Sequence, residues 1–186
     1  MRTTLLVSHL RHFLATAAIV GLIGFSAGCD AYQDVVVIGN DIIVRNFSFS
    51  GSNIDVNQDG SIGSYHREVD ELTSDIVDDG AVLLYADGEL ILDGGAGTWT
   101  ALPFTQGVDI DDDLIVDWTL TFTYSYDIQD LYVDIIASAT GFTFDDFPRT
   151  DFKLVLIPGN LYVGSGKAGI DYSNYEAVRQ AYGIAE

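Results

Sequence analysis

The chain has 186 residues, of which 28 are acidic and eight basic, and 48% of its residues are hydrophobic. This hydrophobic content is too high for a disordered acidic segment, and the length suits one domain. A net charge of −20 excludes nucleic acid as a partner, because binding phosphates requires a surface of lysine and arginine. The single cysteine excludes an internal disulfide framework and a multi-cysteine zinc site.

Residues 1–28 are predicted to be a signal peptide. Arg2 and Arg11 give it a basic start, and the apolar stretch of 13 residues from Phe13 to Phe25 is too short to span a bilayer. The next four residues, Ser26-Ala27-Gly28-Cys29, resemble the lipobox of bacterial lipoproteins. The resemblance implies cleavage before Cys29 and acylation of this cysteine, so that two or three acyl chains hold the protein on a membrane. The alternative is an ordinary signal peptide in which the cysteine is coincidental.

Removal of residues 1–28 leaves 28 acidic and six basic residues, a net charge of −22. Aspartate outnumbers glutamate 23 to 5, and Lys153 and Lys167 are the only lysines. This composition is typical of surfaces adapted to very high salt, where screening over about 3 Å at 1 M reduces self-repulsion. The alternative explanation of the charge is a set of calcium sites.

After a short lipidated tether at residues 29–34, residues 35–186 form a single predicted domain in which strand signals dominate. Runs of β-branched and aromatic residues between turn residues predict strands at 35–38, 42–49, 81–86, 89–92, 98–102, 118–126, 131–139, 141–144 and 152–157. The clearest is 118–126, where aromatic or leucine residues alternate with threonine or serine. Period two places the apolar side chains on one face, so this strand is half-buried.

Two short helices fit between the strands. Residues 72–78 place Leu72 and Ile76 on one face, and Tyr175, Val178 and Tyr182 form a stripe near the C-terminus. Ser173 and Glu176 have the spacing of a capping box, and Gly183 ends this helix. We expect the C-terminal helix to dock on a sheet, with a partner-binding tail as the alternative.

These elements predict an all-β protein, an antiparallel, jelly-roll-like β-sandwich with one or two short helices. A closed barrel is the alternative architecture.

Two motif matches carry no function. The G-x-S-x-G pattern at 24–28 lies in the signal peptide, away from the strand–turn–helix context of a hydrolase nucleophile. The G-x-G-x-x-G pattern at 164–169 lacks the helix and the parallel βαβ unit of a dinucleotide-binding fold. No nucleotide is therefore expected as a partner.

The segment 55–62 resembles the calcium loops of EF-hand and dockerin modules. Asp55, Asn57 and Asp59 would supply side-chain oxygens and Ser61 its carbonyl, but His66 stands where the bidentate acid should be. The alternative is an Asp/Asn/Gly turn between two strands. Asp109, Asp111, Asp112 and Asp113 are a second acidic cluster, for which a solvated loop is the favoured interpretation. A structural calcium ion is thus the only cofactor considered.

The protein is not expected to be an enzyme. His66 is the only histidine after processing, acylation leaves no free thiol, and no feature of the sequence marks a nucleophilic serine or a carboxylate pair. Carbohydrate binding is the most specific activity that the residues suggest, through a sugar stacked on Trp99, which follows a glycine-rich loop. The alternative for Trp99 is a place in the core, which is also the expectation for Trp118.

Five ordered segments carry a longer resemblance: 72–80, 81–85, 99–103, 152–159 and 174–178. Together they resemble small, uncharacterised secreted proteins and lipoproteins of Bacteroidetes-like bacteria. The resemblance implies an exported β-protein of the cell envelope and no particular chemistry. The leading hypothesis is a membrane-anchored, non-enzymatic structural or interaction protein whose partner is a glycan or an envelope protein. The alternative is a glycan- or peptide-binding module with a structural calcium site.

Overall fold

The structure is a computed structural model that describes residues 35–38, 42–87, 98–109, 115–139, 142–164 and 169–185. All of them belong to one compact unit, Ala31–Glu186. The predicted signal peptide, Cys29 and the strand at 89–92 lie outside the described residues. Among the helices that are described, none combines the length and the apolar character needed to cross a membrane.

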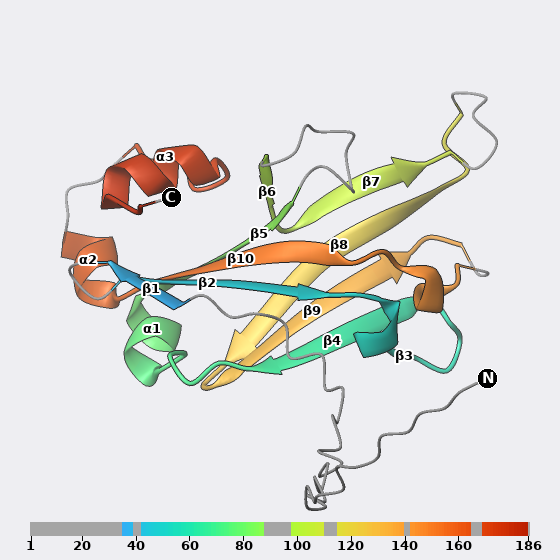
Figure 1. Ribbon diagram of the computed structural model, residues 1–186, viewed down its shortest axis with the longest axis horizontal. Coiled ribbons are helices and arrows are strands. Elements are labelled where there is room, and N and C mark those ends of the chain that lie inside the picture. Colours follow the sequence, from blue (N-terminus) through green and yellow to red (C-terminus); the bar gives the residue numbers. More distant parts are fainter. Residues whose placement is uncertain are drawn as a thin grey trace, which may run out of the picture. The chain divides into compact units, whose positions relative to one another are not determined.

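The described residues form ten strands in two five-stranded sheets, and every pair of neighbouring strands is antiparallel (Figure 1). In spatial order, sheet A contains β1 (Val35–Ile38), β2 (Ile42–Phe49), β10 (Thr150–Ile157), β5 (Ala81–Asp87) and β6 (Trp99–Ala101). Sheet B contains β3 (Asp55–Val56), β4 (Ile62–Glu68), β9 (Asp130–Ala137), β8 (Trp118–Asp127) and β7 (Phe104–Val108). The predicted antiparallel β-sandwich is confirmed.

The core of the sandwich is formed mainly by alternate residues of the longer strands, on the faces that the two sheets turn toward each other. From sheet A these include Phe47, Phe49, Leu84, Phe152 and Leu154, and from sheet B Phe122, Leu131, Val133 and Ile135, all at most 2% exposed. The ring of Phe152 stacks on that of Phe49 with centroids 4.6 Å apart. In β8, Leu120 and Phe122 are buried whereas Thr121 and Thr123 are not, which confirms the period-two pattern.

Three α-helices, α1 (Ser74–Asp79), α2 (Gly159–Gly164) and α3 (Tyr175–Tyr182), and two 3₁₀ turns, η1 (Gly51–Asn53) and η2 (Phe144–Asp146), complete the described elements. The predicted strand at 141–144 is wrong, because η2 begins at Phe144. Both Phe144 and Phe147 are buried, and a spacing of three residues places them on one side of a 3₁₀ turn, whereas a strand would place them on opposite faces.

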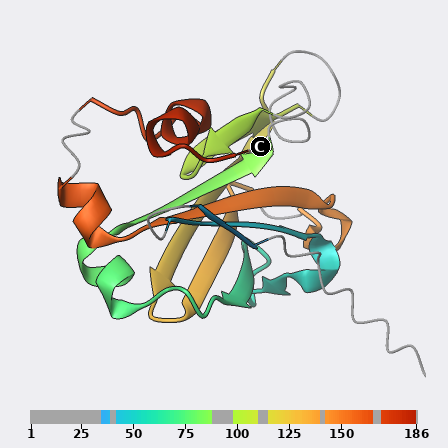
Figure 2. The ribbon, with the colours of Figure 1, turned by 60° about the vertical axis from the view of Figure 1, so that its left-hand side comes forward.

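Helix α3 covers the face of sheet A that points away from sheet B (Figure 2). Its residues Tyr175, Val178 and Tyr182 are buried together with Val44 and Val155 of sheet A. The C-terminal helix therefore docks on a sheet, as expected, and Gly183 ends it in the left-handed conformation at a φ of 69°. Strand β10 is consequently covered on both faces.

Candidate functional site

A pocket of about 740 Å³ opens where α3 meets the edge of sheet A. We call it the Trp99 pocket and define it by its lining: Thr98, Trp99, Lys153, Asp171, Ser173, Asn174, Tyr175, Glu176 and Arg179. Trp99 comes from the edge strand β6 and Thr98 directly precedes it, whereas Lys153 comes from the outer face of β10. The other lining residues come from α3 and the segment before it. Ligand sites are typically concave, with aromatic walls and a few convergent polar groups, and this pocket has both.

Two contacts hold the segment before α3 against sheet A. The buried Tyr85 of β5 donates a hydrogen bond from its hydroxyl group to the carbonyl oxygen of Tyr172, at 2.7 Å. Asn174 forms an isolated antiparallel bridge with Thr100 of β6. The polar wall of the pocket is thereby fixed relative to the strand that carries Trp99.

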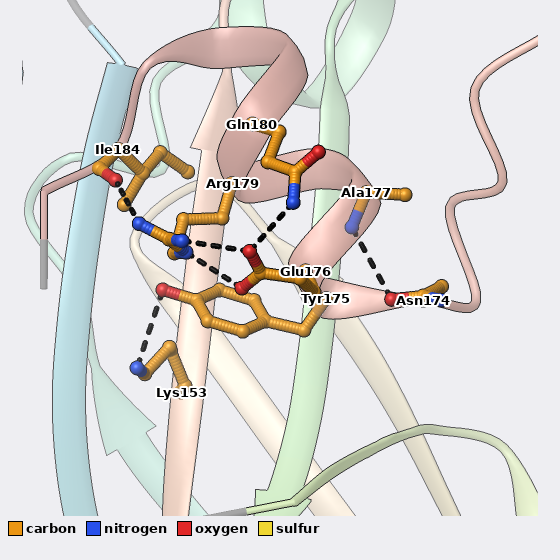
Figure 3. Close-up of polar contacts among 8 residues, drawn as sticks. All are labelled: Lys153, Asn174, Tyr175, Glu176, Ala177, Arg179, Gln180 and Ile184. Atoms are coloured by element: carbon orange, nitrogen blue, oxygen red, sulfur yellow. Dashed lines mark hydrogen bonds and ion pairs between the residues drawn. The ribbon is translucent and has the colours of Figure 1, made fainter.

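The ammonium group of Lys153 lies between two aromatic rings. Its Nζ atom is 4.3 Å from the ring centroid of Trp99 and 4.3 Å from that of Tyr175. It also donates a hydrogen bond to the hydroxyl oxygen of Tyr175, at 3.2 Å (Figure 3). The two rings meet edge-on with centroids 6.1 Å apart. Cation–π attraction and this hydrogen bond give the two rings and the cation a fixed mutual arrangement.

The capping of α3 differs from the prediction by one residue. The side-chain oxygen of Asn174, not that of Ser173, accepts a hydrogen bond from the backbone N–H of Ala177, at 3.2 Å (Figure 3). Ser173 instead donates its backbone N–H and its hydroxyl hydrogen to Asp171, at 3.0 and 2.6 Å. Asn and Ser are both favourable N-cap residues. Because the side chain of Ser173 is already bonded to Asp171, Asn174 acts as the N-cap of α3.

Glu176 and Arg179 form an ion pair at the rim of the pocket. Arg179 donates from Nε and Nη2 to the two carboxylate oxygens of Glu176, both at 2.7 Å, and Gln180 donates to the same carboxylate at 2.8 Å (Figure 3). The hydrogen bonds from Arg179 and then Gln180 lower the pKa of Glu176 to about 2. Glu176 is therefore a carboxylate at neutral pH, and its charge offsets that of Arg179.

Trp99, which the sequence suggested for stacking, is half-buried in this pocket and packs beside the cluster under α3. The expectation for Trp118 is met in part: its ring is partly buried, packs against the core of the sandwich, and lies 5.1 Å from that of Phe142. Lys153 and Tyr175 were not predicted from the sequence to line a binding pocket. A signal for Lys153 was present, because it is one of two lysines in the chain.

The predicted calcium loop is the connection of a β-hairpin between β3 and β4. The side-chain oxygen of Asn57 accepts from the N–H groups of Ser61 and Ile62, both at 3.0 Å, and Asp59 accepts from the N–H of Ser61 at 2.9 Å. Hydrogen bonds from the Ser61 hydroxyl and backbone lower the pKa of Asp59. Asp55 pairs with Ser64 in the ladder. This is a side-chain-stabilised turn, and calcium binding by Asp55, Asn57, Asp59 and Ser61 stays a prediction.

No group of three or more histidine, cysteine or acidic side chains with metal-binding geometry occurs in the part of the chain that the structure describes. Of the second acidic cluster, Asp109 is described, and Asp111, Asp112 and Asp113 lie outside the described residues.

His66 lies on the outer face of sheet B, away from the Trp99 pocket. Its Nε2 atom is 2.7 Å from Oδ1 of Asp130, and its ring stacks on Tyr132 with centroids 4.7 Å apart. Ser64, two residues before it, donates its hydroxyl hydrogen to Asp134 at 2.6 Å. The expectation that the protein is not an enzyme stays a prediction.

Comparisons with models of protein families, with curated proteins and with solved structures found no match. The resemblance of the sequence to small envelope lipoproteins stays a prediction.

Proposed function

We propose that the protein is a membrane-anchored cell-envelope lipoprotein whose β-sandwich binds a glycan in the Trp99 pocket. The sequence is compatible with two functions, that of a structural or interaction protein and that of a glycan- or peptide-binding module. The observation that favours the second is the convergence of Trp99 and Tyr175 with the polar side chains of Asp171, Ser173 and Asn174 around one pocket.

The chemistry of a sugar matches this lining. The C–H face of a pyranose ring is apolar and packs on an aromatic side chain, while the hydroxyl groups at its edge need hydrogen-bond partners. Asp171 supplies carboxylate oxygens and Asn174 an amide, which is both donor and acceptor. Charged acceptors form the stronger hydrogen bonds with hydroxyl donors.

The rigidity of the pocket also favours binding. Lys153 holds the rings of Trp99 and Tyr175, and Tyr85 and Thr100 hold the segment that carries the polar groups. Side chains that are already fixed lose little conformational entropy when a ligand binds, so more of the contact energy appears as affinity.

The test of glycan binding is an array of oligosaccharides probed with the detergent-solubilised full-length protein in high salt. We expect Trp99→Ala to weaken the best ligand at least tenfold, equivalent to about 1.4 kcal/mol, because the stacking surface is removed. Tyr132→Ala is the matched control, since it removes a 39% exposed aromatic side chain from the outer face of sheet B. Failure of the wild-type protein to bind any glycan, or equal losses in both variants, would refute the proposal.

The anchor needs a separate test. The lipobox that ends at Cys29 predicts that labelled fatty acid is incorporated into the protein and that Cys29→Ala abolishes the label. The same variant is expected to leave the membrane fraction. Labelling that persists in Cys29→Ala would contradict lipidation at this cysteine.

A further inference from the structure

We infer that the outer edge of β7 pairs with the same strand of a second copy of this chain, in an antiparallel arrangement centred on Gln106. The inference goes beyond glycan binding and is independent of the Trp99 pocket. It follows from the backbone groups that β7 directs away from its sheet, from the symmetry of these groups, and from the lack of charge along this edge.

Strand β7 lies at the edge of sheet B, and β8 is its only strand partner among the described residues (Figure 1). Thr119 of β8 directs both of its backbone groups toward Ser138, which follows β9. Its N–H donates to the hydroxyl oxygen of Ser138 at 2.8 Å, and its carbonyl oxygen accepts from the N–H of Ser138 at 2.9 Å. Gly107 of β7, which lies opposite Thr119, is therefore in a non-hydrogen-bonded pair, and its own N–H and C=O groups point away from β8.

The same holds for Thr105, because hydrogen-bonded and non-hydrogen-bonded pairs alternate along an antiparallel ladder. Both Thr105 and Gly107 are exposed. Each of them thus presents one N–H donor and one C=O acceptor on the outer edge of sheet B. Groups arranged in this way are a template on which a further strand adds.

The outward groups are symmetric about Gln106. When two copies of β7 run antiparallel with Gln106 opposite itself, Thr105 lies opposite Gly107 of the second copy, and Gly107 lies opposite Thr105. Each of these pairs exchanges two hydrogen bonds, so all the outward groups of β7 are satisfied at once. A register centred on Thr105 would instead place Gly107 opposite Pro103, which has no N–H group.

The side chains are compatible with this register. The two copies of Gln106 would form a non-hydrogen-bonded pair, in which the side chains are close, and a primary amide is both donor and acceptor. Phe104 and Val108 lie on the same face of β7 as Gln106 and would face each other across the contact. On the opposite face Val116, 57% exposed, lies against Gly107 and would cover Thr105 of the second copy.

Charge favours a second copy as the occupant of this edge. Two copies of a chain of net charge −20 repel each other, so they meet most easily where the contact itself is uncharged. Residues 94–108 contain no charged side chain, and β7 has neither the charge nor the internal proline that commonly protects an edge strand. Of the other edges, β3 has two residues, one of them Asp55, and β6 is bridged by Asn174.

Cysteine cross-linking of the detergent-solubilised full-length protein tests the register. Gln106→Cys places two cysteines opposite each other with Cα atoms about 4.5 Å apart, within the range of disulfides. We expect most of this variant to form a disulfide-linked dimer on mild oxidation in high salt.

Three controls make the cross-link specific to the register. Thr105→Cys should cross-link at least tenfold more slowly, because residue 105 lies about 8 Å from its copy, given a rise of about 3.4 Å per residue and a strand spacing of about 4.8 Å. Ser125→Cys, exposed on the outer face of sheet B, measures random collisions. The wild-type protein, which keeps Cys29, measures cross-linking through that residue.

Thr105→Pro tests the hydrogen bonds of the contact. The N–H group of Thr105 faces the edge, so proline there removes no bond to β8 and is compatible with an edge strand, whereas it prevents the ladder with a second copy. Thr105→Ala is the matched control, because it removes the same hydroxyl group and keeps the N–H. In sedimentation analysis we expect a dimer for the wild-type protein and Thr105→Ala, and a dissociation constant at least tenfold higher for Thr105→Pro.

Cross-linking of neither Gln106→Cys nor Thr105→Cys, or equal cross-linking of both, would overturn the inference. A dimer that is unchanged in Thr105→Pro would also overturn it, because the two copies would then join through another surface, such as the edge of β1. Melting curves establish that each variant is folded. If Thr105→Pro does not fold, the ratio of cross-linking at positions 106 and 105 still decides the question.

Discussion

Replacement of Tyr85 by phenylalanine tests how the polar wall of the Trp99 pocket is held in place. Tyr85 is fully buried in β5, and its hydroxyl group donates to the carbonyl oxygen of Tyr172 at 2.7 Å. The variant removes this hydrogen bond and leaves the carbonyl group without that donor. The free energy of unfolding is expected to fall by about 1–2 kcal/mol, because the contribution of the hydrogen bond is lost and a buried acceptor is left unpaired. For a chain of this size, that lowers the melting temperature by about 2–8 °C.

The effect of Tyr85→Phe should depend on pH in a defined direction. Burial raises the pKa of Tyr85 above its ordinary value of about 10, so above pH 10 the unfolded chain loses this proton before the folded chain does. The unfolded state then binds fewer protons, and the stability of the wild-type protein falls as pH rises. Between neutral pH and pH 11 the ionisation of Tyr85 in the unfolded chain lowers the free energy of unfolding of the wild-type protein by about 1.4 kcal/mol. The variant has no hydroxyl group at this position and loses nothing by this route. The two proteins should therefore become nearly equal in stability by pH 11.

The assay is urea unfolding of both proteins at pH 7, 9, 10 and 11, in constant high salt. The difference between the two proteins isolates Tyr85 from the other groups that titrate in this range. Tyr132→Phe is the control, because Tyr132 is 39% exposed on the outer face of sheet B, and it should change stability little at any pH. A stability difference for Tyr85→Phe that is constant from pH 7 to pH 11 would refute the reasoning, as would a variant more stable than the wild-type protein at pH 7.

Three further predictions concern the fold, the charge and the hairpin loop. Gly51→Ala should lower the free energy of unfolding in urea by about 3 kcal/mol or more, because a methyl group at this position meets backbone atoms of η2. Gly60→Ala should lower it by about 1 kcal/mol, because the space there is open and only the φ of 73° is unfavourable. Equal losses in the two variants would contradict this. Lowering KCl from 3 M to 0.1 M should lower the melting temperature, because self-repulsion is no longer screened, and an unchanged value would argue against a salt-adapted surface. If the hairpin loop binds calcium, calorimetry in high salt should give a saturable signal that disappears in both Asp55→Ala and Asp59→Ala; silence in the wild-type protein would leave the loop a turn.

The elements that could be predicted from the sequence are those whose burial is regular. From Trp118 to Tyr124 every second residue faces the core, so the period of two can be recognised in the sequence. The stripe of Tyr175, Val178 and Tyr182 is equally regular, because α3 buries a single face against sheet A. Such patterns depend only on local geometry, which is why the fold class followed from them.

Strand β4 shows why other elements were missed. Its inward-facing residues are Gly63, Tyr65 and Arg67, which lie opposite Ile135, Val133 and Leu131 of β9. Only glycine fits at position 63, because the ring of Phe144 occupies the space that a side chain would need. Arg67 lies over the ring of Phe47. The partners that make these residues suitable for a core come from other parts of the chain. No alternation of apolar residues is therefore visible in 62–68.

The pocket was beyond prediction for a related reason. Trp99, Lys153 and Tyr175 are far apart in the chain, and the pairing of β6, β10 and β5 and the docking of α3 bring them together. The sequence suggested Trp99 from the glycine-rich loop before it, and nothing in the spacing of the residues linked it to a lysine. A contact set by strand pairing across three elements leaves no local pattern.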